Sequence, residues 1–166
     1  MRGVIALTGA TGFIGSALVR RLIQEGWRVR ALHRSLSPPV HLTGLSPEWV
    51  RGTLEDRDCL EGLVGDADVV IHCAGVLRGI TEADFYPANV EAVLRLAFIA
   101  ASRSPAPRFL LMSSLAAREP ELSPYAASKR MGRSLYQKSP TSFRGPRFVL
   151  RRSMVQETAR YFPCCA

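Results

Sequence analysis

The sequence predicts an α/β protein with a doubly wound parallel sheet and helices on both faces. Three observations lead to this fold class. Short apolar runs alternate with helical patterns, each run is apolar throughout, and the first run leads directly into a glycine-rich turn. A strand that is apolar on both sides must be covered on both sides, which parallel sheets achieve with their crossover helices.

The composition supports a single globular domain. The chain has 166 residues, of which 47% are hydrophobic and 22% charged, so a core can form and a disordered or collagen-like class is excluded. The first apolar stretch is short and rich in glycine, which excludes a spanning helix or a typical signal sequence. The four cysteines lack metal-ligand spacing, which favours a reducing compartment. We therefore expect a cytoplasmic protein without a membrane segment or a metal site.

The first strand is expected at residues 4–7, where an apolar run precedes the glycine turn. Apolar residues then recur with helical spacing from Ile14 onward, and Gly26 is placed to end this helix. A second strand is expected at residues 29–33. Residues 35–47 are rich in serine and proline and show no helical pattern, so we expect a loop there.

The middle of the chain continues the alternation of strands and helices. A weak third strand is predicted at residues 49–51, and a short helix with acidic residues at its start at residues 56–64. The clearest buried strand after the first is at residues 68–75. A long apolar helix follows through Ala101, and Pro87 is expected near its start because an interior proline would break it.

The last predicted elements are a strand and a helix. The fifth strand is expected at residues 109–112. Ser123 and Pro124 then have the character of a helix N-cap followed by proline at the first helical position. Another helix is therefore expected to open at Tyr125.

The turn between the first strand and the first helix carries Gly9, Gly12 and Gly15. Gly9 would make the tight turn, Gly12 would let a pyrophosphate approach the backbone, and Gly15 would let the helix pack closely on the sheet. The helix N-terminus adds partial positive charge. The dinucleotide contacts expected here come from Gly9, Thr11, Gly12, Phe13, Ile14 and Gly15. The alternative is a glycine-rich turn that binds no ligand.

The end of the second strand indicates which dinucleotide is bound. An acidic residue there would hold the ribose hydroxyls of NAD, but the sequence has His33 followed by Arg34. A guanidinium can pair with the 2′-phosphate of NADP. We therefore expect NADP, with NAD as the second choice. The alternative for Arg34 is a solvated surface arginine.

Tyr125 and Lys129 are four residues apart, which places a phenol and an ammonium on one face of the expected helix. The cation would lower the pKa of the phenol, whose free value of about 10 is too high for a base near neutral pH. Ser114 follows the fifth strand, and such sheets bind ligands at the carboxyl ends of their strands. We expect Tyr125 and Lys129 to be catalytic, with Ser114 donating to the substrate oxygen. Taken alone, this spacing is also that of an ordinary helix face.

Together these segments resemble the short-chain dehydrogenase/reductase superfamily, and within it the extended or atypical branch of NAD(P)-dependent epimerases, dehydratases and reductases. The resemblance covers roughly residues 3–130 and is carried by TGATGFIG, HCAG, Asn89 at the start of the following helix, the Ser-Ser pair and YAASK. It implies a Rossmann fold with Tyr125 as acid/base, Lys129 as its activator and ribose anchor, and Ser114 as the substrate-oxygen donor. It also implies dinucleotide contacts from Cys73, Ala74, Gly75, Asn89, Tyr125 and Lys129. For Asn89, a helix-capping role is the alternative.

The sequence departs from the family pattern after the third strand. The family commonly has Gly-Asp there, with the acid placing the adenine, but Gly52 is followed by Thr53. Asp56 comes slightly later and could serve only if the loop differs. Leu54 is expected to pack on the adenine.

The C-terminal quarter departs further. The net charge of +8 lies entirely after residue 127, where nine basic side chains accompany one acidic side chain. Gly132 and Pro140 also interrupt the helical pattern. We therefore expect a dinucleotide-binding Rossmann domain at residues 1–130 and a divergent basic segment at residues 131–166, poorly ordered or a truncated remnant. One interpretation is a truncated or frame-altered gene product.

Three functions are compatible with these features. The first is an NADP-dependent oxidoreductase, epimerase or dehydratase that acts on a small-molecule substrate. The second is a non-catalytic dinucleotide-binding or assembly protein that lacks a substrate lobe. The third is nucleic-acid binding by the basic tail, but no aromatic interleaving or DNA-binding motif supports it, so no specific nucleic-acid partner is expected. A homodimer that pairs through the long helices is also compatible with the resemblance. His72, inside an apolar strand, is expected to be a core histidine with satisfied hydrogen bonds.

Overall fold

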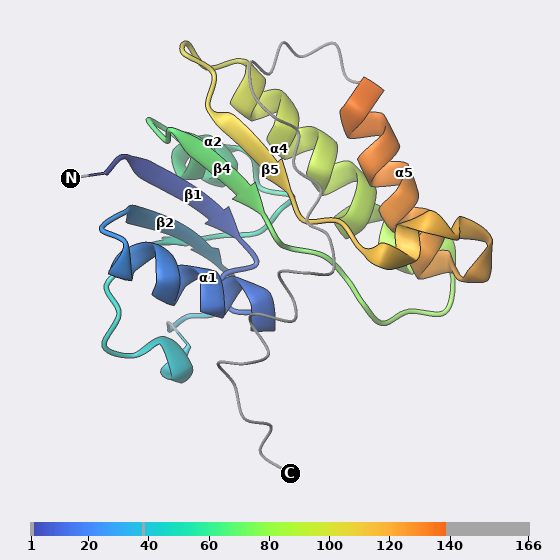
Figure 1. The fold of residues 1–166 in the computed structure, drawn as a ribbon, viewed down its shortest axis with the longest axis horizontal. Helices are drawn as coiled ribbons and strands as arrows, with labels where there is room; N and C mark the ends of the chain where they lie inside the picture. Colours follow the sequence, from blue (N-terminus) through green and yellow to red (C-terminus); the bar gives the residue numbers. More distant parts are fainter. Residues whose placement is uncertain (1, 38, 139–166) are drawn as a thin grey trace.

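The computed structural model describes residues 2–37 and 39–138, which contain one sheet of five parallel strands (Figure 1). The strands are β1 (Val4–Thr8), β2 (Arg28–His33), β3 (Glu48–Arg51), β4 (Val69–His72) and β5 (Arg108–Leu111). Their spatial order is β3-β2-β1-β4-β5, and each neighbouring pair is parallel. The order reverses between β1 and β4, and in such sheets ligands bind at the carboxyl ends beside this reversal.

Helices and short helical turns make the connections between these strands. The described residues form α1 (Phe13–Gln24), α2 (Arg57–Val64), α3 (Glu82–Tyr86), the π-helical turn η2 (Pro87–Glu91), α4 (Ala92–Ala101) and α5 (Pro124–Lys138). The same part of the chain holds the 3-10 turns η1 (Val40–Leu42), η3 (Leu115–Arg118) and η4 (Pro120–Leu122). Figure 1 shows α1 on one side of the sheet, with α2, α4 and α5 on the other.

The sheet divides the core into two apolar layers. On one face, Val19 of α1 packs in a cluster with Ile5 of β1. On the other face, Leu63 of α2 and Leu96 of α4 pack in a cluster with Val70 of β4. Because alternate side chains of a strand point to opposite faces, apolar strands supply both layers. The predicted fold class, with helices on both faces of a parallel sheet, is therefore confirmed.

Helix α1 ends where the sequence predicts. Gly26 has a φ of 81°, a left-handed conformation that glycine adopts without a side-chain clash. The N–H of Trp27 donates to the carbonyl of Leu22 at 3.0 Å, which is the long bond of a Schellman motif. The following connection, residues 35–47, was expected to lack helical structure, but it contains the single 3-10 turn at Val40–Leu42.

The helical stretch after β4 starts earlier than predicted, at Glu82. Thr81 and Asp84 form a capping box there, and helical structure continues without interruption to Ala101. Pro87 is therefore not near the helix start, and that prediction is wrong. The proline opens the π turn, in which the N–H of Ala92 bonds to the carbonyl of Pro87. Because Pro87 has no N–H to donate, the α-helical hydrogen bonds of α3 end at Tyr86, directly before it.

Helix α5 also begins as predicted. It opens at Pro124, and the Oγ of Ser123 accepts a hydrogen bond from the N–H of Ala126 at 3.1 Å. This is the N-cap arrangement that a Ser-Pro pair favours.

Gly132 does not interrupt this helix, contrary to expectation. Helix α5 continues to Lys138, and a Cβ on residue 132 would overlap the backbone oxygen of Asn89. Glycine at this position therefore allows α5 to lie directly against η2. The expected domain boundary after residue 130 falls inside α5, while Pro140 and the rest of the basic segment lie outside the described residues.

Candidate active site

The turn between β1 and α1 is shaped by Gly9 and Gly15. Gly9 has a φ of 71°, and a Cβ there would lie 2.6 Å from the backbone nitrogen of Ala74. A Cβ on Gly15 would overlap the backbone oxygen of Gly9. Gly9 thus allows the turn, and its lack of a side chain allows the backbone to lie close to the chain after β4. Gly15 lets the first turn of α1 rest on the glycine turn itself.

Gly12, the N-cap of α1, is partly engaged in the turn. Its N–H donates to the carbonyl of Gly9 at 3.1 Å, so this amide stabilises the turn and is not directed at a ligand. A Cβ on Gly12 would meet only that same oxygen within 4 Å, at 3.4 Å, so its other side is open to close approach. The first N–H groups of a helix have no partner within it, and at α1 this first turn contains Ile14. Thr11 is an exposed residue of the same turn.

The end of β2 holds His33 and Arg34. His33 is buried, with its ring edge-to-face against Trp49 at a centroid distance of 5.2 Å. Its Nδ1 has no hydrogen-bond partner in the part of the chain that the structure describes. Arg34 is exposed. Of these two predicted contact residues, Arg34 is therefore the one whose side chain reaches solvent.

The residues after β3 are engaged in folding. Asp56 caps α2 by accepting a hydrogen bond from the N–H of Cys59 at 3.0 Å, so its carboxylate is committed to the helix. Leu54 packs partly buried against the core cluster that contains Leu63, and its carbonyl accepts from Arg95 at 2.6 Å. Only the exposed part of Leu54 is available for the predicted adenine contact.

The segment after β4 lies at the centre of the candidate site. Its residue Ala74 meets Gly9 closely, as described above. Its next residue, Gly75, faces the other way: a Cβ there would lie 2.8 Å from Oδ1 of Asn89 and 3.6 Å from Nζ of Lys129. One short segment therefore touches the glycine turn on one side and the residues of the predicted catalytic helix on the other.

His72 and Cys73 precede this contact, and both are neutral. Nδ1 of the fully buried His72 lies 2.7 Å from Oγ1 of Thr8, an oxygen that also accepts from the N–H of Ala74 at 3.3 Å. Nε2 of His72 has no partner among the described residues, so the expectation of a satisfied core histidine is only half met. Burial, with a smaller contribution from the charge of Lys129, lowers the pKa of His72 to about 3. Burial raises the pKa of the Cys73 thiol to about 12.

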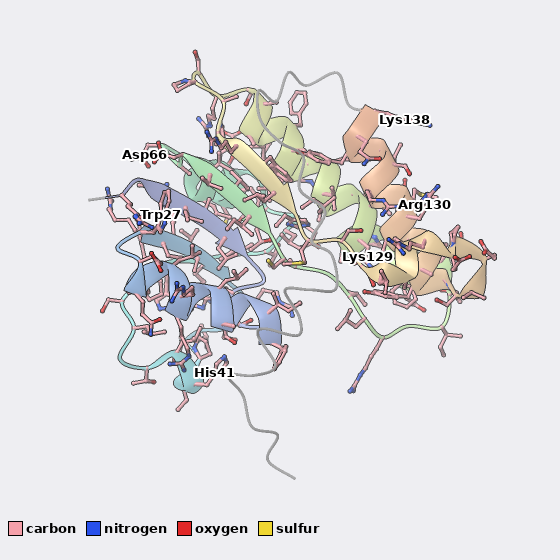
Figure 2. The ribbon with its side chains drawn as sticks, in the orientation of Figure 1. Trp27, His41, Asp66, Lys129, Arg130 and Lys138 are labelled. Carbon is pink, nitrogen blue, oxygen red and sulfur yellow. The ribbon has the colours of Figure 1, made fainter. Side chains whose placement is uncertain are left out.

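Lys129 extends from α5 to the carboxyl ends of β4 and β5, where Figure 2 labels it. Its Nζ donates a hydrogen bond to the carbonyl of Met112 at 3.0 Å. Burial lowers its pKa below the usual value for lysine. An ammonium group has three donors, so the bond to Met112 fixes the group and leaves donors for hydroxyl groups of a ligand.

Asn89 joins the segment after β4 to α5. Its Oδ1 accepts from the N–H of Val76 at 3.0 Å, and its Nδ2 donates to the carbonyl of Val76 at 3.0 Å and to Oγ of Ser128 at 3.0 Å. Oγ of Ser128 donates in turn to the carbonyl of Tyr125 at 2.7 Å. Asn89 lies inside the helical stretch, in η2, so it is neither at a helix start nor a helix cap. It holds the first turn of α5 in place.

Tyr125 and Ser114 lie at the start of α5 and just after β5. The ring of Tyr125 packs edge-to-face against Phe85 at a centroid distance of 5.9 Å. Oγ of Ser114 accepts a hydrogen bond from the N–H of Ala116 at 3.2 Å. Because Oγ of Ser114 accepts this bond, its hydroxyl hydrogen can still donate to another oxygen. The contact of Ser114 with a substrate oxygen stays a prediction.

Sequence reasoning missed several residues that build this site. Ser128 lies inside the YAASK motif, and its spacing of three from Tyr125 could have indicated a bond back to that carbonyl. The pattern Thr81-x-x-Asp84 could have located the helix start as a capping box. Nothing in the sequence indicated that Lys129 would bond to the carbonyl of Met112, because the side chain of Met112 takes no part in that bond.

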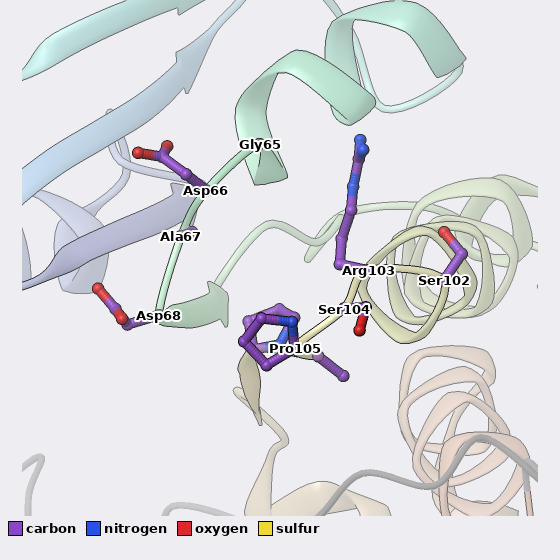
Figure 3. Close-up of a pocket in the computed structure, with 10 residues that line it drawn as sticks. Gly65, Asp66, Ala67, Asp68, Ser102, Arg103, Ser104 and Pro105 are labelled. Carbon is purple, nitrogen blue, oxygen red and sulfur yellow. The ribbon is translucent and has the colours of Figure 1, made fainter.

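The opposite end of the sheet has a different character. A hollow of about 610 Å³ lies before β4 and β5, lined by residues 65–68 and 102–107 (Figure 3). The described residues contain no cluster of three side chains that could hold a metal ion. None of the helices in the described part of the chain is long and apolar enough to cross a membrane.

Comparison with known proteins identifies a matching family and relatives of this chain. The model of the NAD dependent epimerase/dehydratase family matches residues 5–154. A ceramide reductase from Caulobacter vibrioides is 48% identical over 133 residues, which cover 79% of this chain and 41% of that protein. A 4-hydroxy-2-methyl-3-oxo-4-farnesyl-3,4-dihydroquinoline-1-oxide ketoreductase from Stigmatella aurantiaca is 38% identical over 96 residues, which cover 55% of this chain and 28% of that protein. The chain thus spans less than half the length of these curated relatives.

Solved structures resemble the fold at similar coverage. A short-chain dehydrogenase/reductase superfamily protein from Agrobacterium tumefaciens with bound NAD has a TM-score of 0.74 and 26% identity, and the match covers 89% of this chain and 48% of that chain. A UDP-glucuronic acid 4-epimerase from Bacillus cereus in complex with NAD has a TM-score of 0.74 and 23% identity, with coverage of 89% and 56%. The second likeness concerns the fold alone.

Proposed function

The chain belongs to the NAD dependent epimerase/dehydratase family of the short-chain dehydrogenase/reductase superfamily, and on that premise we propose that it is an NAD(P)-dependent oxidoreductase acting at a carbonyl or hydroxyl carbon. One observation carries the proposal. The segment after β4 touches the glycine turn through Ala74 and approaches Lys129 through Gly75. A turn suited to a diphosphate and a cation suited to a phenol therefore lie next to each other, at the end of the sheet where such folds bind ligands.

The residues present fit a dinucleotide. Gly12 has an open side at the N-terminus of α1, where backbone N–H groups and the helix dipole favour a diphosphate. Lys129 has donors left for ribose hydroxyls after its bond to Met112. When bound, the nicotinamide would supply or accept the hydride.

The protein's own part in the reaction is proton transfer and orientation. We assign the proton to the phenol oxygen of Tyr125, which gives it to the substrate oxygen in reduction and takes it back in oxidation. The positive charge of Lys129 favours the phenolate form of that phenol. The hydroxyl of Ser114 donates to the same substrate oxygen and orients it. Asn89 acts through Ser128 as a positioning residue for the first turn of α5.

We place NADP ahead of NAD as the preferred dinucleotide. The family is NAD-dependent, and the Agrobacterium tumefaciens structure holds NAD, so NAD is the second choice. Arg34 supports the preference, since its exposed guanidinium comes directly after His33, the residue at the position where a carboxylate would hold the ribose hydroxyls of NAD.

The names of two relatives, a ceramide reductase and a ketoreductase, support the reduction direction. The Caulobacter vibrioides protein is named for ceramide and the Stigmatella aurantiaca protein for a farnesyl-bearing quinoline oxide. Both names describe molecules with long apolar chains, whereas UDP-glucuronic acid is a charged sugar nucleotide. These names describe two different classes of substrate, and reduction and epimerisation are also different net reactions.

The test of the proposal separates binding from turnover. Trp49 packs against His33, so NADPH binding is expected to quench its fluorescence. Tyr125→Phe is expected to keep NADPH affinity and to lower the rate of NADPH oxidation by about 10²–10⁴-fold. Tyr86→Phe, which removes the same hydroxyl from an exposed residue of α3, is the matched control and should leave the rate unchanged. Binding of NADPH without turnover would indicate a non-catalytic dinucleotide-binding protein, and absence of binding would refute the proposal.

A further inference from the structure

A chain of buried polar groups crosses the carboxyl ends of β1 and β4. Oγ1 of Thr8 accepts a hydrogen bond from the N–H of Ala74 at 3.3 Å and lies 2.7 Å from Nδ1 of His72. The side chains of Thr8 and His72 are fully buried. Through Ala74, this chain reaches the segment that meets Gly9 on one side and approaches Lys129 on the other.

The hydroxyl of Thr8 indicates which ring nitrogen of His72 carries the hydrogen. A hydroxyl has one hydrogen to donate, and Nδ1 of His72 is the acceptor that the described residues place within its reach. If Nδ1 carried a hydrogen instead, the hydroxyl hydrogen of Thr8 and the lone pair of Nε2 would both be buried without a partner in this part of the chain. Burial also keeps the ring neutral, since it lowers the pKa of His72 to about 3. The single hydrogen of the ring is therefore on Nε2.

Nε2 of His72 and Oγ of Ser113 are both buried, and neither has a hydrogen-bond partner among the described residues. The register pairs His72 with Leu111, and the N–H of Met112 donates to the carbonyl of His72 at 2.9 Å. Ser114 keeps an extended backbone, with φ −125° and ψ 153°. Because side chains alternate along an extended chain, Ser113 lies on the same face of the sheet as Leu111 and His72.

The two groups are neighbours that do not bond directly. Parallel strands lie about 4.8 Å apart and each residue rises about 3.3 Å, which puts the Cα atoms of His72 and Ser113 on the order of 8 Å apart. One water molecule can bond two side chains at such a separation, since each of its hydrogen bonds spans about 2.7–3.0 Å. Buried waters are typical of places where polar groups have no other partner.

The surroundings favour a neutral ligand over an ion. The positive charge of Lys129 acts on the ring of His72, so a cation there would be repelled. A metal ion would also need a lone pair on Nε2, where the ring carries its hydrogen. An anion would lose its hydration in a buried place, at a large cost in free energy. Water is neutral, and it can accept from Nε2–H while it donates to the serine oxygen.

We propose that one buried water molecule bonds Nε2–H of His72 and Oγ of Ser113, and that His72 is a positioning residue for the two connections that follow β4 and β5. The hydrogen bonds then run in one direction, from the N–H of Ala74 through Thr8, His72 and the water to Ser113. One end holds the segment between the glycine turn and Lys129, and the other end holds the residue before Ser114. The water site stands without the proposed function, whereas the effect on dinucleotide binding rests on it.

NMR of the ¹⁵N-labelled full chain without dinucleotide tests the water site. Long-range ¹H–¹⁵N correlation should show the hydrogen of the His72 ring on Nε2, and this hydrogen should give a dipolar cross peak to water. Ser113→Ala should keep the cross peak and speed exchange of the Nε2 hydrogen with solvent by about two- to tenfold, because the water loses one partner. Ser46→Ala, which changes an exposed serine, is the matched control and should not alter the exchange rate.

Three results would overturn the water site. The first is a hydrogen on Nδ1, and the second is a ring N–H without a cross peak to water. The third is loss of the cross peak in Ser113→Ala, which would assign it to the serine hydroxyl. The first two results need no variant of the chain, so they hold even if a substitution prevents folding.

Two substitutions of His72 test the positioning role. Asparagine carries its amide oxygen on Cγ, where histidine carries Nδ1, so His72→Asn keeps an acceptor for Thr8. Glutamine carries its amide one carbon further out, so His72→Gln keeps a donor near the place of Nε2 but withdraws the acceptor from Thr8. Thr8 then holds Ala74 less firmly, and His72→Gln should weaken NADPH binding by about two- to tenfold relative to His72→Asn.

Fluorescence titration at equal folded fraction, checked by circular dichroism, measures both dissociation constants. Equal values for His72→Gln and His72→Asn overturn the positioning role while the water site and dinucleotide binding stand. If the parent chain binds no NADPH, the proposed function fails, and the NMR result still decides the water site.

Discussion

Two helical glycines give opposite predictions for the same substitution, and the contrast tests how α5 is positioned. Gly132→Ala would place a Cβ in the backbone oxygen of Asn89, whereas Gly62 of α2 has nothing within 4 Å of a Cβ. Alanine improves helix propensity at either position by about 0.5–1 kcal/mol. At Gly62 this gain stands alone. At Gly132 it is opposed by the clash between the new Cβ and the backbone oxygen of Asn89.

The size of that clash follows from the contact. Carbon atoms pack at about 3.5–4.0 Å, and to reach an ordinary contact distance α5 and η2 must separate by on the order of 1 Å. Over-packing of this kind costs about 1–3 kcal/mol, which exceeds the propensity gain. We expect Gly132→Ala to reduce the free energy of unfolding by about 1–2 kcal/mol and Gly62→Ala to increase it by about 0.5–1 kcal/mol.

Thermal unfolding followed by circular dichroism measures both changes. At roughly 2–4 °C per kcal/mol for a chain of this size, the two variants should differ in Tm by at least several degrees and in opposite directions from the parent. Gly132→Ala should also weaken NADPH binding, because the displaced Asn89 orders the segment that contains Gly75. Equal Tm values for the two variants would show that α5 does not rest on η2 as described.

Two further predictions concern the ends of β2 and β4. Arg34→Glu should weaken NADPH binding by about tenfold or more and leave NADH binding little changed, because a charge-assisted pair of about 1.5–3 kcal/mol becomes a repulsion. Fluorescence titration measures both dissociation constants. An unchanged ratio of the Kd for NADPH to the Kd for NADH would refute the assignment of Arg34. His72, whose pKa falls from the usual 6.5 to about 3 on folding, binds a proton only in the unfolded chain between these values, so its contribution to stability is lost as pH falls through that window. Urea unfolding should show this loss as a decrease in the free energy of unfolding of up to about 1.4 kcal/mol per pH unit. His72→Asn should make this pH dependence weaker than His41→Asn does, which replaces an exposed histidine. Equal pH dependence in the two variants would contradict a buried neutral His72.

The parts of the fold that could be predicted are those fixed by neighbours in the sequence. The apolar runs, Gly26 after α1 and the Ser123–Pro124 pair each carry their own signal. Pro87 was misplaced because its effect depends on packing. A proline in a helix interior is unfavourable in isolation. Here the helical stretch changes from α3 to the π turn η2 at Pro87, and Asn89 of that turn is held by residues distant in sequence.

The candidate site shows the same division. The spacing of Tyr125 and Lys129 gave their common helix, and the position of Ser114 followed from the end of a strand. The environment of Lys129 could not be predicted, because its anchor is a backbone carbonyl and its pKa is lowered by burial. Likewise, the sequence indicated that Gly12 belongs to the turn but not that its N–H would be used within it.

The two glycines in contact with backbone oxygens explain why the site is compact. At Gly15, α1 rests on the carbonyl of Gly9, and at Gly132, α5 rests on the carbonyl of Asn89. Gly9 approaches the chain after β4 through Ala74, and Asn89 holds the same chain through Val76. The backbone of α1 thus lies against Gly9 and the backbone of α5 against Asn89, and both of these residues contact the chain after β4. The separation between the proposed diphosphate site and Lys129 is therefore set by close backbone contacts and not by long side chains between the helices. Substitutions that enlarge either glycine should therefore disturb dinucleotide binding more than substitutions of equal destabilising effect in the core, which is a comparison that equilibrium titration of matched variants can make.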